Sequence, residues 1–145
     1  MKHVRRLGIA LLTFALGVAV SPIRFDVEGM GCGKLIDGGG GFGITSYSSS
    51  YFVKLWFVQS AYASPEKADA VFDQHVSQAV NVIELGPKMN REGFVIGRRA
   101  MAIFYSPQLS ENYTEIIWTD GRFLHYIAST STLHVKEFEK QRRWK

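Results

Sequence analysis

The sequence predicts an α+β fold with the order strand, helix, three-strand meander, helix, in which the long helix packs on one face of an antiparallel sheet. Residues 47–62 alternate between two faces with a period of two, which indicates a long strand. An amphipathic pattern follows from Ser64, and Asp120-Gly121 separates two β-rich segments as a two-residue hairpin turn would. These patterns together favour a meander with a helix laid across it.

The long helix is predicted to begin at Ser64-Pro65-Glu66. The serine hydroxyl can cap the helix, proline suits its first turn, and the acid lies near the positive end of the helix dipole. Apolar residues then recur every three or four positions as far as Ile83, and we predict that Gly86-Pro87 ends the helix.

The meander and the last helix follow from shorter signals. Residues 90–93 indicate a turn, and residues 94–105, 113–119 and 122–128 indicate three strands. Ser129, Thr130 and Ser131 offer caps for a final helix. We expect three apolar contacts from this helix, namely Leu133, Val135 and Phe138.

The N-terminus has the pattern of a secretory signal. Basic residues precede an uncharged apolar run over residues 7–20, which is shorter than a comfortable transmembrane helix. We therefore predict a signal peptide over residues 1–21 and export to the periplasm or the extracellular space. Because no clean cleavage motif is present, the alternative is an uncleaved segment that anchors the protein to the membrane.

A glycine-rich segment follows the signal. Eight of the fifteen residues from Gly29 to Gly43 are glycine, and ordering glycine costs more entropy than ordering any other residue. We predict a flexible segment over residues 22–43, with Cys32 as a free thiol in it, and a single α+β domain over residues 44–145.

The charge distribution argues against nucleic-acid binding. The formal net charge is +4, but without the three basic residues of the leader 14 basic residues face 13 acidic ones. A nucleic-acid interface needs a stripe of cations across a surface. Here five cations crowd the last ten positions: Lys136, Lys140, Arg142, Arg143 and Lys145.

Catalytic and metal-binding patterns are weak in this chain. One cysteine excludes disulfide frameworks and multi-cysteine zinc sites, and the four histidines lack metal-ligand spacing. His75 and His125 fit core or strand-edge positions. The candidate acid–base carboxylates are scattered over different elements: Glu84, Glu92, Glu115 and Asp120. We assign no catalytic, cofactor-binding or metal-binding residue, predict no cofactor, and lean towards a protein that is not an enzyme.

Aromatic residues supply the one positive functional indication. Trp56, Trp118 and Tyr126 form a candidate interaction surface if one sheet face stays open.

The first hypothesis is a non-enzymatic envelope protein that contacts an unknown partner through its sheet. The alternative is a small-ligand carrier or an unrecognised hydrolase with a site on the open face. A pocket holding a polar pair such as His125 with Glu115 favours the alternative. The membrane is contacted only through residues 7–20, if they are uncleaved.

Several short motifs between Ser64 and Phe138 resemble an uncharacterised family of small exported bacterial proteins. They are Ser64-Pro65-Glu66-Lys67-Ala68, Ile83-Glu84-Leu85-Gly86-Pro87-Lys88, Gly97-Arg98-Arg99, Trp118-Thr119-Asp120-Gly121 and Phe138-Glu139-Lys140. The resemblance implies bacterial export and a single α+β domain, and it implies no activity. The layout is also similar to cystatin-like folds, although the terminal helix departs from that pattern and the Gln-x-Val-x-Gly loop is absent from the sequence.

Overall fold

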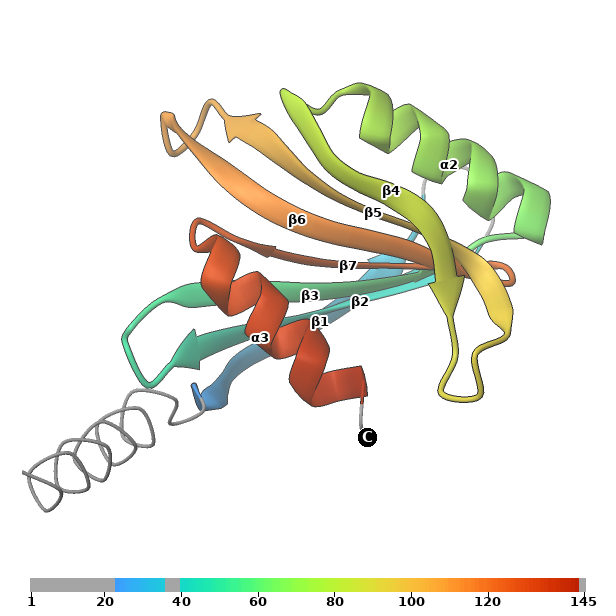
Figure 1. The fold of residues 1–145 in the computed structure, drawn as a ribbon. Coiled ribbons are helices and arrows are strands. Elements are labelled where there is room, and N and C mark those ends of the chain that lie inside the picture. The colour runs from blue at the N-terminus through green and yellow to red at the C-terminus, as the bar shows by residue number, and fades with distance from the viewer. Residues whose placement is uncertain (1–22, 36–39, 144–145) are drawn as a thin grey trace, which may run out of the picture.

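Seven antiparallel strands form one sheet in the order β1-β2-β3-β7-β6-β5-β4, with a helix on each face (Figure 1). The computed structural model describes residues 23–35 and 40–143, so the predicted signal over residues 1–21 lies outside the described residues. The predicted α+β class with an antiparallel sheet is confirmed. The bounds are β1 Phe25–Lys34, β2 Gly41–Ser49, β3 Lys54–Ala61, α2 Pro65–Ser77, β4 Asn81–Met89, β5 Val95–Ser106, β6 Glu111–Asp120, β7 Phe123–Ser129 and α3 Thr132–Arg143.

Most of the described part of the glycine-rich segment belongs to the sheet, as β1 and the start of β2, which corrects the expectation of a flexible segment over residues 22–43 and a domain that starts at residue 44. β1 and β2 pair with each other, and β2 pairs with β3. Glycine leaves room where β2 side chains lie over β1. A Cβ at Gly33 would stand 2.8 Å from the ring of Phe42. Close packing and strand pairing therefore offset the entropy that these glycines lose.

The single long strand predicted over residues 47–62 is instead two strands joined by a turn. Ser49 ends β2, and its hydroxyl accepts hydrogen bonds from the backbone N–H groups of Tyr51 and Val53, both at 3.1 Å. Phe52 adopts a positive φ of 62°. The serine hydroxyl thus stabilises a turn that the alternating pattern hides.

Helix α2 is shorter than predicted. The predicted cap is present, because the Ser64 hydroxyl accepts a hydrogen bond from the Lys67 N–H, but the helix ends at Ser77 rather than at Gly86-Pro87. Residues 81–89 form β4, which pairs with β5 at the edge of the sheet. An edge strand tolerates Pro87 because one side of the strand needs no donor.

From residue 90 onwards the chain follows the sequence prediction closely. Asn90 Oδ1 accepts hydrogen bonds from the N–H groups of Glu92 and Phe94, and Gly93 has a φ of 86°, as the predicted turn requires. Asp120 pairs with Phe123, so the hairpin turn is centred on Gly121 and Arg122, one residue later than predicted.

Two apolar clusters pack on opposite faces of the sheet. On the face towards α3 the cluster is Tyr47, Leu55, Phe57, Met101, Ile116, Ile127, Val135 and Phe138. On the face towards α2 it is Tyr62, Ala68, Phe72, Ala100, Ile117 and Leu124. Neighbouring residues such as Ile116 and Ile117 belong to different clusters because successive strand side chains point to opposite faces. We call these the α3 face and the α2 face.

Two of the three apolar contacts predicted for the last helix are present in the structure. Val135 and Phe138 are buried, whereas Leu133 is 66% exposed and points away from the sheet. Ion pairs connect both helices to the sheet. Arg99 binds Glu139 of α3 and Glu84 of β4. On the other face, Arg98 binds Asp73 of α2. Arg98 and Arg99 are neighbours on β5 and therefore lie on opposite faces of the sheet.

Within the described residues, no helix has the length and apolar character needed to cross a membrane.

Gly97 tests the tightness of the strand packing. A Cβ at this position would stand 1.9 Å from the backbone oxygen of Thr119, so we expect Gly97→Ala to lower the free energy of unfolding by about 1–3 kcal/mol. Gly86→Ala is the control in the neighbouring strand, where an added Cβ meets nothing within 4 Å. Urea unfolding measures both variants, and equal midpoints would contradict the packing argument.

Candidate functional site

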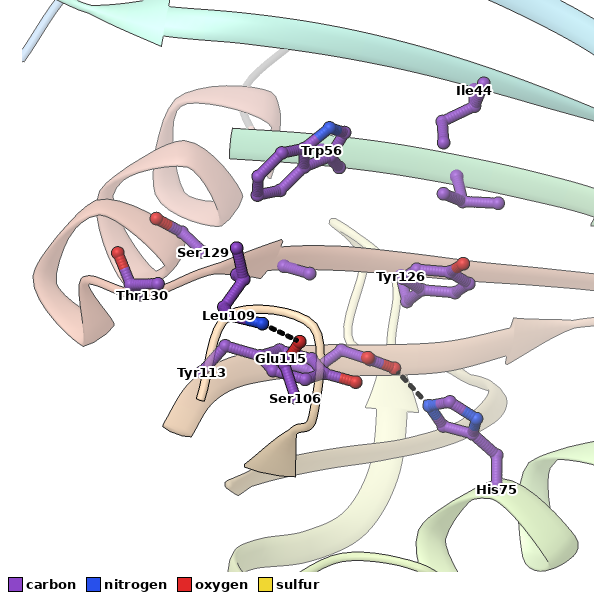
Figure 2. A pocket seen from close by; sticks show the side chains of 12 residues that line it. Ile44, Trp56, His75, Ser106, Leu109, Tyr113, Glu115, Tyr126, Ser129 and Thr130 are labelled. Carbon is purple, nitrogen blue, oxygen red and sulfur yellow. Dashed lines mark hydrogen bonds and ion pairs between the residues drawn. The ribbon is translucent and has the colours of Figure 1, made fainter. Parts of the chain in front are cut away.

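A pocket of about 270 Å³ opens on the α2 face of the sheet (Figure 2). Its floor comes from β2, β3, β7 and β6, and its walls come from the end of α2 and the loop between β5 and β6. It is lined by Ile44, Trp56, Val58, His75, Ser106, Leu109, Tyr113, Glu115, Tyr126, Ala128, Ser129 and Thr130. Apolar and aromatic surface thus surrounds a few polar groups, which is typical of small-molecule sites.

The pocket depends on how α2 is seated. Ala68 and Phe72 are fully buried against the sheet, and His75 follows one turn later on the same side of the helix. The helix ends two residues after His75, so this side chain stands at the rim of the covered area. The Phe104 ring centroid lies 4.8 Å from that of His75, and the Tyr126 ring stacks on it at 5.9 Å.

Glu115 brings a carboxylate into this apolar site. The residue is only 1% exposed, and its Oε1 lies 2.5 Å from His75 Nε2 (Figure 2). In the sheet it pairs with Ala102 on one side and with Ala128 on the other. These small neighbours leave room above the sheet for the carboxylate and the imidazole.

Burial and pairing shift the pKa of both partners. Burial raises the pKa of Glu115 above its ordinary value, and the hydrogen bond and charge of His75 offset this only in part. For His75, burial lowers the pKa, but the hydrogen bond to Glu115 and its negative charge outweigh burial, so the pKa is raised. The pairing therefore favours the charged forms of both groups, which burial alone would disfavour.

Three polar atoms at the pocket keep hydrogen-bonding capacity. Among the described residues, Glu115 Oε2 and the hydroxyl groups of Tyr113 and Tyr126 have no hydrogen-bond partner. No described polar side-chain atom is both fully buried and unsatisfied, so these atoms reach open space. Burial also raises the pKa of Tyr126 to about 12, which keeps its hydroxyl protonated and able to donate.

The residues of the candidate interaction surface lie on two different faces. Trp56 and Tyr126 line the pocket on the α2 face. Trp118 lies on the α3 face, where its ring stacks on His125 at 5.2 Å and on Phe57 at 6.1 Å. The three side chains therefore do not form one continuous surface, and partner binding through either face stays a prediction.

The polar pair in the pocket has a different histidine from the one named in the sequence hypothesis. His125 occupies the α3 face beside Trp118 and Phe57, so it cannot meet Glu115 on the other face. His75 takes that place, although the sequence suggested a core position for it. The available signal was the spacing of His75 from Ala68 and Phe72, which puts it on the buried side of α2.

The interactions of His134, another candidate side chain, are structural. His134 Nε2 lies 2.9 Å from the Ser49 hydroxyl and its Nδ1 lies 2.8 Å from the Ser131 hydroxyl, which ties the β2–β3 turn to the start of α3. Burial lowers the pKa of His134. Cys32 is exposed and has no hydrogen bond among the described residues. The same residues hold no group of three or more His, Cys, Asp or Glu side chains placed to bind a metal ion.

Comparison of the chain with protein-family models, with curated proteins and with solved structures finds no match.

The His75–Glu115 pair can be tested by titration. In the wild-type protein we expect a His75 pKa above 6.5, and in Glu115→Gln we expect it below 6.5, because only the effect of burial then remains. NMR titration of the histidine ring resonances measures the change. His125 is the internal control: burial lowers its pKa, and its position on the other face predicts the same value in both proteins. An unchanged His75 pKa in Glu115→Gln would show that the pair does not form.

Proposed function

We propose that this protein binds a small, mainly apolar molecule in the pocket between α2 and the sheet. The observation that carries the proposal is Glu115 Oε2, a carboxylate oxygen without a hydrogen-bond partner among the described residues, placed at a pocket lined mainly by apolar and aromatic side chains. A ligand that covers this oxygen removes it from water, and burying a polar atom without a partner is costly, so the oxygen selects a ligand that carries a hydrogen-bond donor.

The polar atoms define the ligand. Glu115 Oε2 accepts a hydrogen bond, so the ligand carries a hydroxyl or N–H donor. The hydroxyl groups of Tyr113 and Tyr126 donate or accept and can bind the other side of the same group. The Trp56 ring provides a flat apolar wall for the body of the ligand.

Binding fits this site better than hydrolysis does. A hydrolase needs a nucleophile activated by a neighbouring base. Two of the pocket hydroxyls serve the backbone instead: Ser106 accepts from the Leu109 N–H, and Ser129 donates to the Lys54 carbonyl. Among the described residues no hydroxyl that lines the pocket bonds to His75. The pair therefore serves to recognise a ligand.

The test uses N-phenylnaphthylamine, an uncharged apolar probe with one N–H donor that fluoresces in apolar sites. We expect saturable binding with one site per protein. Ala128→Leu places three more carbon atoms in the pocket and should weaken binding at least tenfold. Ala70→Leu, on the exposed side of α2, is the matched control and should bind like the wild type.

Glu115→Gln distinguishes the polar contact from simple apolar adsorption. The amide replaces a charged acceptor by a neutral one, so we expect weaker binding of the probe by about tenfold. Absence of saturable binding by the wild-type protein would overturn the proposed function. Equal binding by Ala128→Leu would place the probe elsewhere on the molecule.

We also propose that the protein is exported. The support is the basic stub and the apolar run over residues 7–20. An exported ligand-binding domain would act in the periplasm or outside the cell. The alternative anchored form would hold the pocket near the membrane surface.

Intact mass and N-terminal sequence test the export proposal on protein recovered from a bacterial envelope fraction. We expect a soluble product that lacks roughly 17–21 residues, because a signal peptidase removes the leader. A full-length mass in the membrane fraction would instead indicate an anchor. A full-length mass in the cytoplasmic fraction would contradict export altogether.

A further inference from the structure

A second hollow adjoins the pocket on the α2 face. It has a volume of about 340 Å³ and is lined by Gly29, Met30, Gly31, Ile44, Ser46 and Trp56. Ile44 and Trp56 line both cavities, so the two hollows meet at these side chains. We call the combined cavity the trough.

Glycines leave the floor of the trough without side chains at its β1 end. Gly29 pairs with Ser46 and Gly31 pairs with Ile44, so β1 carries no side chains on this face beside them. A Cβ at Gly31 would stand 3.4 Å from Ile44 Cγ2, an ordinary contact distance. A glycine at this position therefore leaves space above the strand, and it is not required by the backbone conformation.

The trough runs across the strands. From Glu115 on β6 it passes over β7, β3 and β2 to Gly31 on β1. Four strand spacings separate its ends, which corresponds to about 19 Å. Helix α2 packs on β5, β6 and β7, whereas strands β1–β3 lie beyond the helix (Figure 1). The hollow over β1–β3 is therefore not covered by α2.

The two ends differ in chemistry. At the β6 end lie the Glu115 carboxylate and the hydroxyl groups of Tyr113 and Tyr126. Over β2 and β3 the floor is Ile44 and Trp56, and among the described residues that line the second hollow Ser46 carries the one hydroxyl group. This is an elongated apolar surface with hydrogen-bonding groups at one end.

We propose that the trough binds a single-chain amphiphile, with an uncharged hydroxyl head group on Glu115 and a hydrocarbon chain that extends over Trp56 and Ile44 to Gly31. This inference rests on the proposed function and names its ligand class. The chain would cover apolar side chains that the sheet otherwise leaves to water.

The charges favour an uncharged head group. His75 and Glu115 already neutralise each other at 2.5 Å, so a charged head group would be buried without a counter-ion. A carboxylate head group would also face the carboxylate of Glu115. A hydroxyl donates to Oε2 and adds no charge.

The floor of the trough favours a hydrocarbon chain over a peptide. A peptide that lay across the strands would have to satisfy its own N–H and C=O groups. The backbone groups of β2 and β3 are paired with strands on both sides, and over these two strands the trough floor is built from side chains. The edge strand β1 pairs with β2 on one side, and its hydrogen-bonding groups lie in the plane of the sheet rather than towards the trough. A hydrocarbon chain makes no such demand.

The experiment is displacement of N-phenylnaphthylamine by the primary alcohols hexanol, octanol, decanol and dodecanol. With the wild-type protein we expect affinity to rise about fourfold for each added methylene through the whole series. A rise that stops at octanol would overturn the elongated trough while the binding pocket stands. Failure of the probe itself to bind would instead contradict the proposed function.

Gly31→Leu blocks the far end of the trough. We expect it to leave hexanol binding within twofold of the wild type and to stop the rise after octanol. Cys32→Leu is the matched control, because Cys32 is exposed on the same strand and does not line the hollow. Ser46→Leu is a second blocking variant in case Gly31→Leu does not fold. Equal chain-length dependence in the blocking and control variants would overturn the proposal.

The head group is tested with dodecanoate against dodecanol. We expect the carboxylate to bind at least tenfold more weakly at neutral pH, and Glu115→Gln to reduce this difference because it removes the repelling charge. Tighter binding of dodecanoate than of dodecanol would overturn the assignment of an uncharged head group.

Discussion

The burial of Glu115 is the constraint on which the α2 half of the molecule depends. An ionised carboxylate that is 1% exposed needs a partner, and His75 supplies it at 2.5 Å. This requirement fixes more than one contact. It holds the last turn of α2 over β6, keeps the imidazole against Tyr126 and Phe104, and sets the height of the wall at that end of the pocket. A larger neighbour than Ala102 or Ala128 would take the space that the pair occupies.

The sequence predicts well those elements whose signals are local. The cap at Ser64, the turn after Asn90 and the hairpin around Gly121 each depend on a few side chains near the turn itself, and the structure has all three. The end of α2 depends on a distant element. Residues 79–83 suit an amphipathic helix, but β5 would otherwise be an edge strand, and pairing with β4 satisfies its backbone groups, beginning with the Val80 N–H on the Ile103 carbonyl. Tertiary pairing here outweighs local periodicity.

The site was less predictable than the fold because it joins residues 40 positions apart in the sequence. The alternation of β6 places Glu115 on the same face as Ile117, but no local pattern shows that α2 rather than α3 covers that face. For the same reason the sequence favours His125 as the partner of Glu115. His125 lies on β7, directly beside β6, yet its pairing with Trp118 puts it on the opposite face. Similarly, glycine content alone suggested a flexible segment, whereas the pairing of Gly33 with Phe42 depends on the register of β1 against β2.

The two faces of the sheet differ in the size of the side chains that they carry near Glu115 and at the β1 edge, and this difference supports the proposed ligand site. On the α3 face, large residues fill the space beneath the helix: Phe57, Met101, Ile127 and Phe138 pack together, and the Arg142 guanidinium covers the Phe57 ring. On the α2 face, the positions beside Glu115 are alanines and those at the far edge are glycines. Filling both faces equally would stabilise the sheet further, since buried apolar area favours folding. Beside Glu115 the chain instead leaves a pocket with an ionisable pair at its end, and it forgoes part of that stability where a ligand could supply the missing contacts.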